Sequence, residues 1–173
     1  MQYEKLRPYL KWASYYAALI ILYVLQTTPR LFQIFETKPV FILALAVAVS
    51  MFEEVMPSAV FCMITGLLWD VSSDKLLGFN AIILLICGVF ISLICIYYLH
   101  TKIANALMFC SAVALLQGLI DYLFYYAAWN HSNSYMVLVL DILPTALYTV
   151  ISMVPIYFLT KWISYKFNPV VRM

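Results

Sequence analysis

The chain has 173 residues, of which 66% are hydrophobic, 17% aromatic and only 10% charged. Because soluble domains carry about 25% charged residues, this composition excludes an ordinary soluble enzyme or nucleotide-binding domain. The formal net charge of +2 is also too small to indicate a polyanionic partner such as nucleic acid. We therefore expect the protein to act in or at a lipid bilayer.

Seven long runs without a charged side chain make up most of the chain. They are residues 12–29, 39–52, 55–69, 76–101, 103–120, 122–140 and 142–160. A helix that crosses a bilayer needs about 20 mostly apolar residues. The pattern therefore predicts an all-α, polytopic membrane protein with six transmembrane helices in a single domain, residues 1–173. We expect the spans at about residues 11–28, 39–52, 55–69, 81–99, 105–129 and 135–163.

The first three predicted spans follow closely on one another. Basic residues precede the first span, as in a signal peptide, but no small-x-small cleavage site follows, so we expect this span to be retained and to end at Pro29. The next two spans are short for a bilayer, and we expect them to use flanking polar residues or to thin the bilayer locally. Glu53 and Glu54 separate these two spans and are predicted to end a tight helical hairpin, where they could also contact a partner's basic residue.

Lys and Arg are distributed unevenly between the two sides of the predicted bundle. One side has seven of them and the other has three. The seven are Lys5, Arg7, Lys11, Lys102, Lys161, Lys166 and Arg172, and the three are Arg30, Lys38 and Lys75. Cytoplasmic segments carry the excess of Lys and Arg in membrane proteins. The pattern therefore predicts that both termini are cytoplasmic.

Asp121 and Asp141 lie inside the fifth and sixth predicted spans, in the outer half of the bilayer. Carboxyl groups inside a membrane are costly and point to function by default. The structural alternative is that each is protonated or bonded to a neighbouring polar side chain. No nucleophile, metal set or substrate-polarising group accompanies them, so we expect no enzyme activity and no cofactor. The four cysteines show no metal-ligand spacing and are expected to pack as small apolar side chains.

The end of the third predicted span carries glycine and polar residues at informative spacings. Gly66 and Asp70 are four residues apart, so they share one helix face, and glycine there lets a neighbouring backbone approach closely. Gly78 suits a turn with a positive φ, and Asn80 can cap the fourth span. We expect the Asp70 carboxylate to accept hydrogen bonds from backbone amides of this turn and so to hold the third and fourth spans together.

The run Gly66-Leu67-Leu68-Trp69-Asp70, followed by Leu77-Gly78-Phe79-Asn80, resembles the motif at the end of span three in the MreD family of rod shape-determining proteins. Leu25-Gln26-Thr27-Thr28-Pro29 is similar to the family's end of span one, and Lys38-Pro39 to its entry into span two. The resemblance implies a protein of the bacterial plasma membrane that belongs to the cell-wall elongation machinery. It also implies a fold similar to the substrate-binding subunits of energy-coupling-factor transporters.

Two functional hypotheses follow from this resemblance. The first is a non-enzymatic scaffold that binds the transmembrane helix of MreC and, through it, a RodA-type glycosyltransferase and a class B penicillin-binding protein, with the MreB filament as a further partner. The alternative is the substrate-binding subunit of a small-molecule, vitamin-type transporter. Such subunits need a cytoplasmic coupling face rich in small residues, and residues 44–48 in the second span are the candidate for it.

Overall fold

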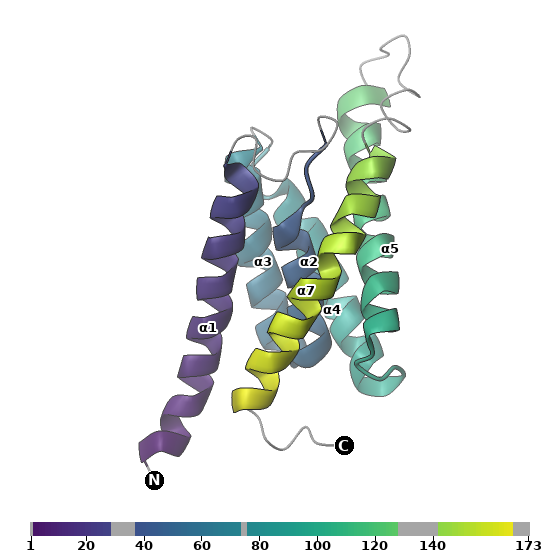
Figure 1. The fold of residues 1–173 in the computed structure, drawn as a ribbon. Helices are drawn as coiled ribbons and strands as arrows, with labels where there is room; N and C mark the ends of the chain where they lie inside the picture. Colours follow the sequence, from purple (N-terminus) through teal and green to yellow (C-terminus); the bar gives the residue numbers. More distant parts are fainter. Residues whose placement is uncertain (1, 29–36, 74–75, 128–141, 168–173) are drawn as a thin grey trace.

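The computed structural model describes residues 2–28, 37–73, 76–127 and 142–167. Its regular elements are helices, which pack into one elongated bundle (Figure 1). In chain order they are α1 (Gln2–Thr27), α2 (Phe41–Phe52), α3 (Val55–Ser72), α4 (Phe79–Tyr97), α5 (Ile103–Asp121), the π-helical η1 (Tyr122–Ala127), which continues α5, and α7 (Leu143–Phe167).

The helices confirm the prediction of an all-α, polytopic membrane protein. Within the described residues, four helices are long and apolar enough to cross a bilayer: Val55–Ser72, Phe79–Tyr97, Ile103–Phe124 and Leu143–Phe167. Helices α1 and α2 overlap the first two predicted spans, residues 11–28 and 39–52. That all six predicted spans cross the bilayer stays a prediction. Residues 135–141 of the sixth predicted span lie outside the described residues.

Helix α1 begins at Gln2, well before the predicted start of the first span at residue 11. The additional turns contain basic residues and Pro8, which carry no apolar signal. Hydropathy reports only the part of a helix that is apolar, and a proline inside a helix, as Pro8 is, favours a break rather than a continuous helix. The apolar run therefore marked only the apolar part of α1 and missed its polar extension.

Helix α2 lies at the centre of the bundle, which explains why its apolar run is so short. Residues 42–51 are all buried, and α2 contacts α1, α3, α4, α5 and α7. At 12 residues it is about 18 Å long. A helix that is apolar on all sides is a buried helix, and here the surrounding helices cover it. A thinned bilayer around α2 is therefore not needed to explain its length.

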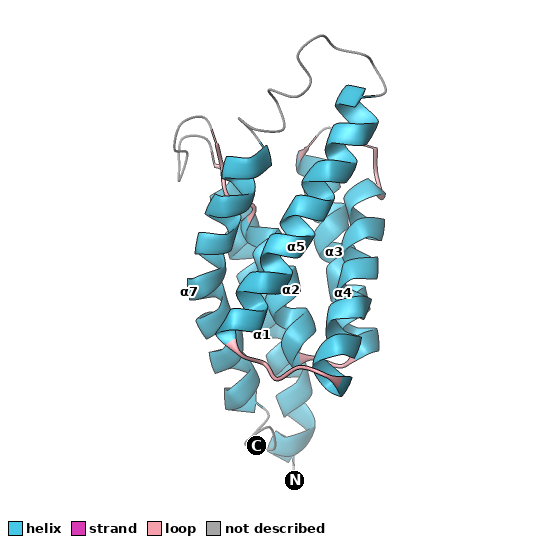
Figure 2. Cartoon of the chain, turned by 90° about the vertical axis from the view of Figure 1, so that its right-hand side faces the viewer, coloured by secondary structure: helices cyan, strands magenta, loops and turns pink. Residues whose placement is uncertain are grey.

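The two ends of the bundle carry different connections. In Figure 1, α1 begins at the lower end of the bundle, and α7 ends at that same end. The α2–α3 and α4–α5 connections lie at the same end, whereas the α3–α4 turn lies at the upper end. In Figure 2, α7, α5 and α4 stand side by side across one face of the molecule. These two ends are called the lower and upper ends below.

Candidate functional site

The carboxylate of Asp70 organises the turn between α3 and α4 at the upper end. Its Oδ2 accepts a hydrogen bond of 2.8 Å from the Gly78 N–H, and its Oδ1 accepts one of 3.0 Å from the Asn80 N–H. Asp70 is only 1% exposed, and Gly78 has a φ of +93°, a conformation that favours glycine. Because both donors belong to the start of α4, the carboxylate joins the end of α3 to the start of the next helix.

Gly66 allows the backbones of α3 and α4 to meet one turn below Asp70. A Cβ atom at this position would lie 2.6 Å from Ala81 N and 2.8 Å from Asn80 C. Both are backbone atoms, so they cannot move aside as a flexible side chain would. The structure thus brings Gly66, Asp70, Gly78 and Asn80 together in one junction.

A chain of polar side chains leads from this junction across to α5. Gln117 Nε2 donates a hydrogen bond of 3.0 Å to Asn80 Oδ1 and one of 2.7 Å to Asp121 Oδ2. Asn80 is fully buried, and its Nδ2 makes no hydrogen bond to a described residue. The carboxyl group of Asp121 is therefore part of a hydrogen-bonded network that begins at the α3–α4 turn.

Sequence reasoning overlooked Gln117, although a signal for it was present. Gln117 and Asp121 are four residues apart, a spacing that places two side chains on the same helix face. An amide one turn from an intramembrane carboxylate is the kind of neighbour that the structural interpretation of Asp121 requires. Nothing in the sequence indicates the contact between Gln117 and Asn80, because 37 positions separate these two residues.

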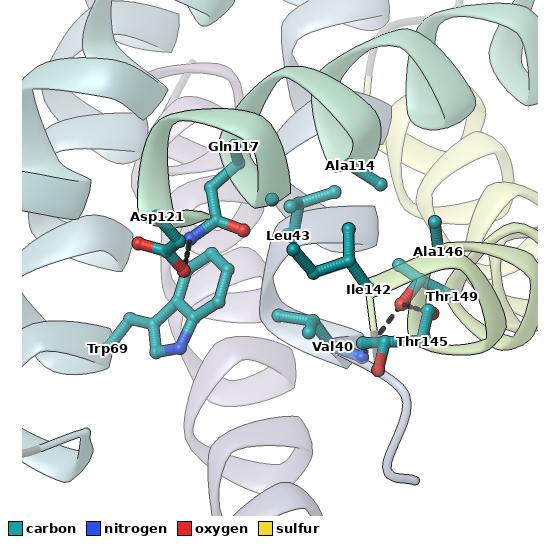
Figure 3. A pocket seen from close by; sticks show the side chains of 11 residues that line it. Val40, Leu43, Trp69, Ala114, Gln117, Asp121, Ile142, Thr145, Ala146 and Thr149 are labelled. Atoms are coloured by element: carbon teal, nitrogen blue, oxygen red, sulfur yellow. Dashed lines mark hydrogen bonds between the residues drawn. The ribbon is translucent and has the colours of Figure 1, made fainter. Parts of the chain in front are cut away.

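Gln117 and Asp121 line a pocket of about 180 Å³ in the upper half of the bundle (Figure 3). Most of its wall is apolar, and its polar groups come from α5 and α7. Its lining residues are Val40, Leu43, Trp69, Ala114, Gln117, Gly118, Asp121, Ile142, Thr145, Ala146 and Thr149. Thr149 Oγ1 donates to Thr145 O at 2.7 Å and accepts from Val40 N–H at 3.0 Å. The pocket therefore has one side with a carboxyl and an amide group and another with hydroxyl groups.

A buried ion pair occupies the lower end of the bundle. Lys11 Nζ lies 2.6 Å from Glu53 Oε2, and the two side chains are only 8% and 7% exposed. The Tyr15 hydroxyl donates to Glu53 Oε1 at 3.0 Å, and the Ser92 hydroxyl donates to the Glu53 carbonyl at 2.8 Å. Burial raises the pKa of the Glu53 carboxyl group, while Lys11 and Tyr15 act in the opposite direction.

This ion pair gives Glu53 a partner within its own chain, so the predicted contact with a partner protein's base is not needed for it. Glu53 and Glu54 form the whole connection between α2 and α3. Glu54 is exposed, and its carbonyl accepts a hydrogen bond of 3.0 Å from the Ser58 N–H at the start of α3. Asp141 lies outside the described residues. Within the described parts of the chain, no three His, Cys, Asp or Glu side chains gather as metal ligands do.

A wide apolar groove runs between α4 and α5, the two helices that stand side by side in Figure 2. These two helices are consecutive in the chain but contact each other much less than α3 and α4 do. The groove has a volume of about 480 Å³. It is lined by Ile83, Ile86, Cys87, Phe90, Ile91 and Ile94 from α4 and by Phe109, Ala112, Val113, Leu116 and Ile120 from α5.

Comparison with known proteins identifies the family. The family model described as rod shape-determining protein MreD matches residues 6–165, which include every described helix apart from the first residues of α1 and the last of α7. Neither the curated proteins nor the solved structures gave a match, so the expected likeness to energy-coupling-factor transporter subunits stays a prediction. The match covers the junction, the pocket, the ion pair and the groove, and the chain therefore belongs to the MreD family of rod shape-determining proteins.

Proposed function

We propose that the protein is a non-enzymatic membrane scaffold of the cell-wall elongation machinery, and that it binds the transmembrane helix of MreC in the groove between α4 and α5. Family membership supplies the role in rod shape. The groove is the observation that carries the finer proposal. MreC in turn connects the scaffold to a RodA-type glycosyltransferase, a class B penicillin-binding protein and the MreB filament.

The shape of the groove suits a single helix from another protein. From Ile83 to Ile94 it extends for about 17 Å at 1.5 Å per residue, a large part of a bilayer core of about 30 Å. Cys87 and Ala112 are small side chains among larger ones, and within membranes small residues let a second helix approach closely. Helix association in lipid rests on such van der Waals packing, so binding of this kind needs no catalytic group.

Two observations favour the scaffold over a vitamin-transporter subunit. Residues 44–48, the candidate coupling face of the transporter hypothesis, are at most 2% exposed within α2, so they offer no surface to a partner. The polar pocket measures about 180 Å³, whereas sites for drug-sized ligands measure about 300–1,000 Å³. The pocket is therefore smaller than the usual site for a ligand of that size.

Filling the groove should abolish MreC binding without unfolding the protein. Ala112 is exposed in the groove, so Ala112→Phe adds a ring where the partner helix would pack. We expect at least a tenfold loss of MreC recovered with the tagged protein from native membranes. Ala17→Phe is the matched control, because Ala17 is exposed on α1, away from the groove. Equal recovery of MreC with both folded variants would exclude the groove as its binding site.

The proposed orientation places the lower end of the bundle, with both chain termini, in the cytoplasm. In a cysteine-free background, Ser73→Cys at the upper end should react with a membrane-impermeant thiol reagent added to intact cells. Phe167→Cys at the lower end should react only after the membrane is permeabilised. The excess of Lys and Arg at the lower end is the physical reason for this expectation, and the opposite labelling pattern would reverse the orientation.

A further inference from the structure

Helix α7 has one face that is open to its surroundings. In Figure 1, α7 passes in front of α2, so this face lies on the outside of the bundle. Its exposed side chains follow one another at intervals of three or four residues, the spacing of a single helix face. They are Leu147, Ile151, Val154, Phe158, Trp162 and Tyr165, each at least 36% exposed. This surface, called the outer α7 face below, is therefore continuous along most of the helix.

The chemistry of the outer α7 face changes along its length. The upper part is aliphatic, whereas Phe158, Trp162 and Tyr165 make the lower part aromatic. From Leu147 to Tyr165 the face is about 27 Å long, close to the bilayer core of about 30 Å. Tryptophan and tyrosine are enriched where the core meets the headgroups. The lower end of α7 therefore lies at headgroup depth, with acyl chains beside the aliphatic part.

Two lysines flank the aromatic part of this face. Lys161 Nζ lies 5.7 Å from the centre of the Tyr165 ring, and Lys166 Nζ lies 4.6 Å from that of Trp162. An aromatic face attracts a cation, so these contacts hold the ammonium groups beside the rings without removing their charge. Neither ammonium group forms an ion pair with a carboxylate in the described parts of the chain. Two positive charges at headgroup depth are thus available to an anion.

The whole face, and not the lysines alone, identifies the kind of anion. Lysine binds phosphate as a point charge, and the Tyr165 hydroxyl and the Trp162 indole N–H are further donors. An anionic phospholipid carries its phosphate at headgroup depth and its acyl chains directly above, so it matches both parts of the outer α7 face. An acidic segment of another protein would match the lysines but not the aliphatic side chains beyond them.

We propose that the lower end of α7 binds the headgroup of an anionic phospholipid, with Lys161 and Lys166 at its phosphate and an acyl chain along the aliphatic part of the outer α7 face. The groove between α4 and α5 is lined by residues of those two helices, so the lipid site is separate from the proposed MreC site. Loss of MreC binding would leave the lipid site unchanged.

The test compares two lipids that differ in headgroup charge. The full chain is released from nanodiscs with equal amounts of phosphatidylglycerol and phosphatidylcholine of identical acyl chains, and the lipids that stay bound are counted by native mass spectrometry. Phosphatidylcholine has the same phosphate, but its choline cation offsets the charge. We expect phosphatidylglycerol to be retained about fivefold over phosphatidylcholine, roughly the effect of one lysine at an anionic membrane surface. Equal retention of the two lipids would overturn the proposal.

Paired variants locate the preference on α7. Lys161→Gln/Lys166→Gln should abolish it, whereas Lys161→Arg/Lys166→Arg keeps both charges and should retain it. Arg7→Gln/Lys38→Gln is the matched control, because it removes the same formal charge from α1 and from the start of α2 and should leave the preference unchanged. An equal loss in this control would mean that overall charge attracts the lipid, which would contradict the site.

A protein ligand gives a different result. If Lys161→Gln/Lys166→Gln keeps the lipid preference but loses a protein that co-purifies with the wild-type chain, the lysines bind an acidic segment of that protein, and the lipid proposal is wrong. All of these variants change side chains that are at least partly exposed, so we expect them to fold.

Discussion

Replacing Asp70 with leucine should lower the free energy of unfolding by about 2–4 kcal/mol. The side chain is 1% exposed and accepts hydrogen bonds from the N–H groups of Gly78 and Asn80. Asp70→Leu removes both acceptors, and a buried donor left without a partner costs about 1–3 kcal/mol. The estimate is below the sum of two full penalties because Gly78 is only partly buried. Folded yield in detergent and unfolding in denaturant would measure the effect.

Asp70→Asn is the control for this prediction. Asparagine has nearly the same shape and keeps one oxygen that accepts from the turn, so it should be clearly more stable than the leucine variant. If both variants fold like the wild type but no longer recover the partner proteins, the carboxylate acts on a partner. If both fold normally and keep every partner, Asp70 does not hold the α3–α4 junction together.

Replacing Lys11 with methionine should cost about 3–5 kcal/mol, because removal of one member of a buried ion pair leaves the other charge without compensation. Lys11 and Glu53 lie 2.6 Å apart with side chains at most 8% exposed. Their contact joins α1 to the α2–α3 connection. The measurement is the unfolding of the purified protein in detergent at neutral pH, compared with the wild type.

The double variant Lys11→Met/Glu53→Gln is the matched control. Glutamine keeps an oxygen for the Tyr15 hydroxyl but has no charge, so most of the stability should return. A double variant as unstable as Lys11→Met alone would contradict the assignment of the loss to an uncompensated charge on Glu53.

The instability of Lys11→Met should also depend on pH. Burial raises the pKa of Glu53 in the folded protein, and Lys11 opposes this; without Lys11, the pKa of the folded state rises further above that of the unfolded chain. A carboxyl group with a raised pKa favours folding below its unfolded value and loses that advantage as the pH increases through its folded value. The deficit of the variant should therefore shrink at acidic pH and be largest at neutral pH. A deficit independent of pH would contradict this account of Glu53.

Local spacing was enough to predict some contacts and not others. Asp70 was expected to accept backbone amides of the following turn, and its two hydrogen bonds span only eight and ten residues. Short separations of this kind are set by helix geometry and turn length. Glu53 was assigned to the end of a hairpin, but its partner Lys11 comes from another helix 42 positions away. In the sequence Lys11 counted only as one basic residue among seven at that side of the membrane.

The short second span illustrates a similar difference. The apolar run identified a helix, but its short length was explained by the use of flanking polar residues or by a locally thinner bilayer. The structure places α2 in the middle of the bundle, where residues 42–51 meet protein on all sides. A hydropathy pattern depends only on residue types, so it does not distinguish apolar side chains that contact lipid from those that contact protein. The choice between the two depends on which other helices surround α2.

Composition and the spacing of charges therefore determine that this chain is a helical membrane protein, where its apolar segments lie and which turn carries the family motif. These properties depend on the length of apolar runs and on residues close together in the chain, both of which one sequence contains. The pairing of Lys11 with Glu53, the contact of Gln117 with Asn80 and the groove between α4 and α5 arise only when the helices pack. Packing brings together side chains far apart in sequence, and it depends on the shapes of all the helices at once.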